Sequence, residues 1–107
     1  MAEFLTRAGL ELLGRNVRVG RLEIDILARE GPVVVVVEVR TRGAGSWQSA
    51  LDSVDYGKQQ RLRRAAAVLW SRRFARQRDI ERMRFDVASV DLESGPEPSV
   101  EYIRAAF

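Results

Sequence analysis

Hydrophobic residues recur along the first half of the chain with two different periods. Apolar residues between positions 4 and 13 fit a short amphipathic helix that Gly14 would end. Residues 17–28 alternate imperfectly between apolar and charged side chains, which predicts a half-buried strand. The unbroken run of valines at residues 33–37, followed by Glu38, Val39 and Arg40, is typical of a central strand covered on both faces. A Gly-Pro pair separates the two strands, so we expect them to form a hairpin.

The second half of the chain repeats the same two periods. Residues 41–49 are rich in glycine and serine and have no period, as is typical of a loop. Residues 55–74 show apolar positions at helical spacing, with Asp55 as the N-cap. Residues 84–90 and 100–103 alternate again and predict two further strands. The order of helix, two strands, helix and two strands predicts an α/β fold with a mixed central sheet flanked by helices.

Composition narrows the classes of function. We expect a single domain over residues 1–107, and the absence of a long apolar stretch or a signal peptide predicts a cytoplasmic protein that spans no membrane. The chain has no cysteine and no histidine, which excludes Ser-His-Asp and Cys-His catalysis. Oxygen ligands would therefore hold any metal, and such ligands favour Mg²⁺, Mn²⁺ or Ca²⁺ over zinc or copper.

Glu23, Asp25, Glu38 and Arg40 form the most informative group of charged residues. If the hairpin turns at the Gly-Pro pair, Asp25 lies opposite Glu38, Glu23 lies opposite Arg40, and all four side chains share one face. Opposed Cβ atoms are about 5 Å apart, so the two carboxylates would repel each other unless a divalent cation bound them. Alternatively, Glu23 and Arg40 form an ion pair while the other two acids are solvated. A register shift of one residue would also separate Asp25 from Glu38.

Basic residues are concentrated in the second half of the chain. Residues 57–84 hold ten of the 18 basic residues against two acidic ones. On the predicted helix, Lys58, Arg61, Arg64 and Arg72 are candidate contacts for the phosphates of nucleic acid. The alternative is a solvated helix face, since 17 of the 18 basic residues are arginine and base composition or heat adaptation also favours arginine.

These motifs together resemble the YraN-like proteins, a bacterial group in the PD-(D/E)XK nuclease superfamily. Similar blocks occur at residues 15–16, 23–28, 37–42, 50–54, 58–62, 84–87 and 105–107. The resemblance implies a restriction-endonuclease-like fold similar to archaeal Holliday-junction resolvases, with Asp25 and Glu38 as metal ligands. In such sites a lysine two residues after the second acid orients or activates the attacking water. In a nuclease of this kind, Glu23 would tune the site or bind a second ion, and Gln59 or Lys58 would orient phosphate or water. The favoured alternative for Gln59 is a surface position on the helix.

The sequence departs from this pattern at three places. Arg40 occupies the lysine position, where it can stabilise negative charge but cannot act as a general base. Leu22 stands where the group usually has glycine. A block with a further acid would fall before Met1, and Glu3 lies about five positions too late to match it.

We therefore expect a Mg²⁺- or Mn²⁺-dependent nuclease that hydrolyses phosphodiesters of DNA, or less readily RNA, with structured or branched DNA among the candidate substrates. A homodimer is one assembly to test. One alternative is a nucleic-acid-binding module that has lost cleavage, consistent with Arg40 and with the missing further acid. Another is an adaptor domain anchored by Trp47 or Trp70, although either tryptophan is more often a core residue.

Overall fold

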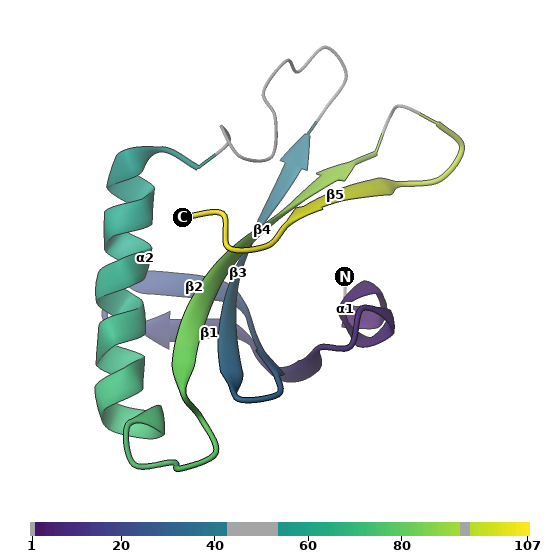
Figure 1. Cartoon of the computed structure of the whole chain (residues 1–107). Helices are drawn as coiled ribbons and strands as arrows, with labels where there is room; N and C mark the ends of the chain where they lie inside the picture. Colours follow the sequence, from purple (N-terminus) through teal and green to yellow (C-terminus); the bar gives the residue numbers. More distant parts are fainter. Residues whose placement is uncertain (1, 43–53, 93–94) are drawn as a thin grey trace.

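A five-stranded sheet lies between two helices (Figure 1). The computed structural model describes residues 2–42, 54–92 and 95–107. The elements are α1 (Ala2–Arg7), β1 (Glu11–Val19), β2 (Leu22–Glu30), β3 (Val33–Arg42), α2 (Tyr56–Leu69) with a π-helical extension (Trp70–Phe74), β4 (Arg82–Asp91) and β5 (Ser99–Ile103). The strand order is β1-β2-β3-β4-β5, and only β3 and β4 are parallel. This mixed α/β sheet confirms the predicted class and agrees with a restriction-endonuclease-like fold.

The hairpin of β2 and β3 has the predicted turn and register. Gly31 adopts φ +56°, a left-handed conformation that glycine accepts without strain, and Pro32 completes the two-residue loop. The pairing runs from Glu30 with Val33 to Ile26 with Val37. The five valines from Val33 to Val37 are buried at 7% exposure or less, because β2 and β4 flank the strand and side chains cover both of its faces.

Each face of the sheet carries its own hydrophobic core. On one face, Leu62, Ala65 and Ala66 of α2 pack with Leu27, Val34 and Val36. On the other, Leu5 of α1 packs with residues that include Ile26, Val35 and Val37. Asp55 is the N-cap of α2 as predicted, and its carboxylate accepts the Lys58 N–H at 2.8 Å. No helix in the described part of the chain is long and apolar enough to cross a membrane.

The helix predicted over residues 4–13 is wrong beyond Arg7. Gly9 adopts φ +87°, and the Leu10 N–H donates to the Leu5 carbonyl at 2.9 Å. This capping at Gly9 ends the helix five residues before Gly14, where the prediction had placed its end. Residues 11–13 belong instead to β1. This strand was not predicted as a separate element.

The strand predicted over residues 17–28 is in fact parts of two strands. Gly20, at φ +61°, opens a two-residue turn between Val19 and Leu22. The alternation of faces also breaks at Asp25, because Ile24 and Leu27 both pack on the α2 side while Ile26 packs on the α1 side. Strict alternation would place Ile24 on the face of Ile26, and the break shows that the two lie on opposite faces.

A buried charge network fastens the C-terminal residues to β4. Asp86 is completely buried and accepts two hydrogen bonds from the Arg84 guanidinium, at 2.9 and 3.0 Å. The Tyr102 hydroxyl donates to the same carboxylate at 2.6 Å, and the Ala105 N–H donates at 2.9 Å. Arg84 also reaches Glu30 at 3.1 Å, so β2, β4 and the C-terminal segment are joined through one cluster.

Candidate active site

Glu38 is a buried carboxylate in a strand that is otherwise aliphatic up to that point. It follows the valines of β3 and is only 3% exposed. Asp25 lies beside it, one position beyond the last pair of the β2–β3 register. The Asp25 carboxylate accepts the Val39 N–H at 2.9 Å and so replaces a strand-to-strand hydrogen bond where the ladder ends. The two carboxylates are therefore neighbours, as the predicted register requires.

Burial and charge act on Glu38 in opposite directions. Desolvation raises the pKa of the Glu38 carboxyl, and the negative charge of Asp25 raises it further. Two cations oppose this rise, since Lys58 Nζ lies 3.6 Å and Arg40 Nη1 lies 3.8 Å from Glu38 Oε1. Arg40 comes from β3, and Lys58 comes from the first turn of α2, where the Asp55 cap holds its backbone.

The second oxygen of Glu38 is left without a partner. Glu38 Oε2 is buried and has no hydrogen bond to any described residue. An orphaned buried oxygen is costly unless something binds it, and a divalent cation is a fitting ligand for a carboxylate. No group of three acids in residues 2–42, 54–92 and 95–107 could hold a metal. Asp25 and Glu38 alone fit Mg²⁺, which commonly uses one or two carboxylates and completes its shell with water and substrate phosphate.

The other predicted residues lie at different distances from this pair. Glu23 lies near Arg18, at 3.8 Å, and the described ion pairs do not include the alternative pairing of Glu23 with Arg40. Gln59 stands next to Lys58, and its side-chain amide donates to the Val54 carbonyl at 3.1 Å, which stabilises the start of α2.

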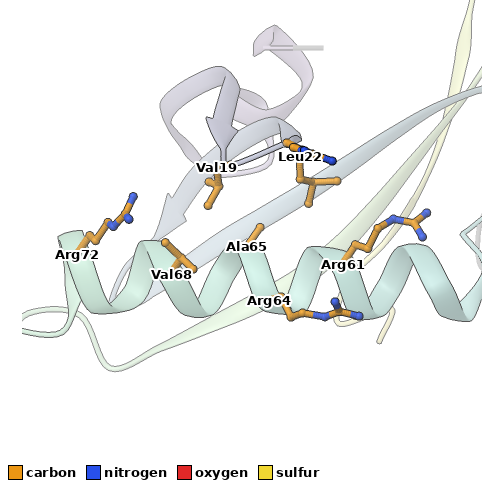
Figure 2. Close-up of a pocket in the computed structure, with 9 residues that line it drawn as sticks. Val19, Leu22, Arg61, Arg64, Ala65, Val68 and Arg72 are labelled. Carbon is orange, nitrogen blue, oxygen red and sulfur yellow. The ribbon is translucent and has the colours of Figure 1, made fainter.

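The three predicted phosphate contacts on α2, namely Arg61, Arg64 and Arg72, are exposed and line a groove beside the β1–β2 turn (Figure 2). Trp70 is half-buried and packs against the core on the α2 side, which is a structural position. Trp47 and the predicted loop from residue 43 onward lie outside the described residues.

The contact between Lys58 and Glu38 joins two residues that sequence analysis had already placed in the site. Periodicity alone does not give their distance, because it depends on how α2 packs against β3. One feature of this region, Arg21, was missed from sequence. Arg21 at the β1–β2 turn joins the arginine groove, and the glycine before it was the available signal for that turn.

The chain is similar to known sequences that belong to one family. A sequence model described as "Uncharacterised protein family UPF0102" matches residues 1–90. A UPF0102 protein of Sorangium cellulosum is 56% identical over 103 residues, covering 96% of this chain and 72% of the relative. A UPF0102 protein of Rhodococcus opacus is 40% identical, covering 99% and 87%, and one of Alkalilimnicola ehrlichii is 45% identical, covering 98% and 78%. The chain therefore belongs to the UPF0102 family, the group of YraN-like proteins.

Proposed function

We propose that this protein is a Mg²⁺- or Mn²⁺-dependent nuclease that hydrolyses phosphodiester bonds of nucleic acid in the cytoplasm. The observation that carries the proposal is the buried Glu38 carboxylate, which has one oxygen without a partner and lies next to Asp25. Such a pair is destabilising in the free protein, so a bound cation accounts for it better than a structural role does.

Asp25 and Glu38 would hold the metal, and Glu23 remains a candidate for tuning the site or for a second ion. Mg²⁺ when bound supplies positive charge to phosphate oxygens and lowers the pKa of a coordinated water. The Val39 N–H fixes the Asp25 carboxylate, which keeps the pair in place when substrate arrives. The protein's own part in the chemistry is thus to preorganise two oxygen ligands in a site shielded from water.

Lys58 supplies the ammonium group that the strand lacks. Arg40 can stabilise charge on a phosphate but does not release a proton near neutral pH. Lys58 lies slightly closer to Glu38 than Arg40 does, on a side chain that is 26% exposed and therefore accessible to substrate. We assign Lys58 the role of donating to a phosphate oxygen or orienting the attacking water, with Gln59 supporting the helix start behind it.

The surroundings of the pair favour a nuclease over a module that only binds nucleic acid. Arg61, Arg64 and Arg72 provide the phosphate-binding surface that either function needs. Two carboxylates beside that surface would weaken binding of a polyanion if they carried no metal. DNA is the first substrate to test, because the contacts are to phosphate and a junction or flap can present a distorted backbone.

A cleavage panel with Mn²⁺ or Mg²⁺ tests the proposal. The substrates are duplex, single-stranded, flap and four-way junction DNA, with one RNA strand for comparison. Wild type should cleave at least one of them, and Glu38→Gln should not, because it removes a charged ligand. Glu11→Gln is the matched control, since Glu11 is exposed on β1 and outside the site.

Metal binding gives an independent readout. Mn²⁺ should raise the melting temperature of wild type and of Glu11→Gln but not that of Glu38→Gln. Absence of both cleavage and metal-dependent stabilisation in the wild type would refute the nuclease proposal.

A further inference from the structure

A groove runs between α2 and the turn that joins β1 to β2. Figure 2 shows Val19 and Leu22 of the turn region pointing toward the side of α2 that carries Ala65 and Val68. The groove has a volume of about 520 Å³. Lys58, which lies 3.6 Å from Glu38, shares one face of α2 with the groove residues Arg61, Ala65, Val68 and Arg72, because these positions follow each other at steps of three and four residues. This helix face therefore leads from the groove toward the carboxylate pair.

Arginines surround this groove. Arg61 and Arg72 lie at its two ends (Figure 2), about 16 Å apart by the rise of a helix. Arg64 also contributes to its lining. Arg21, exposed at the β1–β2 turn, adds a fourth guanidinium from the opposite wall. No acidic residue occurs among the described residues that line the groove. Its charge is therefore complementary to a polyanion along the whole length.

The floor between the arginines is aliphatic. Val19 and Leu22 are half-buried, Val68 is 37% exposed, and none of these side chains offers a hydrogen bond to a base edge. A duplex presents phosphates and sugars on its outside and keeps the apolar faces of its bases stacked within. An unpaired strand can instead place base faces on an aliphatic floor and on guanidinium planes while its phosphates meet arginine.

We propose that this groove binds an unpaired nucleic-acid strand without sequence preference and guides it to the Asp25–Glu38 pair. The proposal names a substrate class for the nuclease and rests on that function only for what happens at the end of the groove. Arg21, which no motif singled out, becomes a phosphate contact, and the β1–β2 turn becomes the second wall of the binding site.

Fluorescence anisotropy in chelator tests the groove without any need for cleavage. The probe is a short labelled oligodeoxynucleotide of mixed sequence, compared with its duplex and with a second unrelated sequence. Arg21→Ala should reduce the slope of log affinity against log salt by about 0.7 for one lost contact to a single strand. Val68→Glu, which places a carboxylate on the floor, should weaken binding by at least about tenfold.

Arg82→Ala and Ala67→Glu are matched controls away from the groove. They make similar charge changes at exposed positions that line a separate hollow between α2 and β4, and both variants should bind like the wild type. Circular dichroism and melting temperature should show all four variants folded. A Val68→Glu variant that is unfolded leaves Arg21→Ala, at an exposed turn, to decide the question.

Several results would contradict the proposal that the groove binds an unpaired strand. These are a duplex bound as tightly as the single strand, variants that bind like their controls, strong dependence on base sequence, or polyglutamate competing as well as DNA at equal charge. The last would assign the groove to an acidic polypeptide. Groove-dependent binding with no cleavage in Mn²⁺ would support strand binding in the groove and count against the nuclease proposal. Cleavage in Mn²⁺ with groove variants that bind like wild type would support the nuclease and contradict strand binding in the groove.

Discussion

Asparagine at position 25 should make the protein more stable than the wild type without divalent metal and less stable when metal is present. Asp25 and Glu38 are adjacent carboxylates, and burial leaves Glu38 little solvent to screen its charge. Two unit charges about 5 Å apart repel by about 3 kcal/mol at an effective dielectric constant of 20. Asp25→Asn removes this repulsion and keeps a carbonyl oxygen for the Val39 N–H.

Two terms reduce the gain. Lys58 and Arg40 already offset part of the Glu38 charge, at 3.6 and 3.8 Å. A neutral acceptor at position 25 also makes a weaker bond to the Val39 N–H than a carboxylate does, by about 1 kcal/mol. We expect a net rise of about 1 kcal/mol in the free energy of unfolding, or about 4 °C in melting temperature for a domain of this size.

A divalent cation should reverse the order. At a metal concentration about 100 times the dissociation constant, binding stabilises the wild type by about 2.7 kcal/mol, and Asp25→Asn loses most of this because it lacks one charged ligand. The variant should then be less stable than the wild type by at most about 1.7 kcal/mol, which is the roughly 2.7 kcal/mol from the metal less the gain of about 1 kcal/mol.

The assay is thermal and urea unfolding at about pH 8, where carboxylates of ordinary pKa are ionised, in chelator and in Mn²⁺. Glu11→Gln provides a control with the same change in net charge at an exposed site. A lower melting temperature for Asp25→Asn in chelator would contradict the repulsion between the two acids. A wild type that Mn²⁺ does not stabilise would contradict the metal site.

Three further predictions address the cations and the buried network. Lys58→Met should lower Mn²⁺-supported cleavage by about 100-fold while leaving the free energy of unfolding in chelator within about 1 kcal/mol of wild type; equal cleavage rates would remove Lys58 from the chemistry. Asp86→Ala should lower the free energy of urea unfolding by about 3–5 kcal/mol, because the Arg84 guanidinium loses its main buried partner, and a loss below about 1 kcal/mol would contradict this. The bond from Arg84 lowers the pKa of Glu30 below its usual 4.5, so Glu30 contributes stability above that pH and loses it as pH falls through the lowered pKa. Glu30→Gln should thus be less stable than wild type near neutral pH, and the difference should shrink in acid; a constant difference in urea titrations across that range would refute the assignment.

The part of the fold that sequence predicted well is the part with strong local signals. The Gly-Pro turn gives the β2–β3 register from Glu30–Val33 to Ile26–Val37, and the run of valines gives the buried strand. Asp25 lies one position beyond this register, and its bond to the Val39 N–H places it beside Glu38. The Asp55 cap and the helical spacing after it likewise gave α2. At the turn, in the valine run and at the helix cap, the local sequence permits few backbone conformations.

The N-terminal region offered competing signals of similar strength. Leucines at residues 12 and 13 fit a helix that continues to Gly14 as well as a strand, and the left-handed conformation of Gly9 decided between them. The preceding contacts of Leu5 and Leu10 with the sheet are tertiary, so periodicity could not reveal them. The break in alternation at Asp25 is similar, since it arises where β2 leaves β3 but remains paired with β1.

The approach of Lys58 to Glu38 follows from topology rather than from a motif. Strands β3 and β4 are the parallel pair of the described sheet, and α2 is the helix that connects them. A crossover of this kind begins at the carboxyl end of its first strand and returns across one face, which brings the start of α2 toward the end of β3 that carries Glu38. A helix start attracts anions through its free N–H groups, and Lys58 adds a full positive charge there. The fold therefore supplies a cation from the helix near the acids. In the proposed nuclease, Arg40 would need only to stabilise charge, because Lys58 would serve the lysine's role.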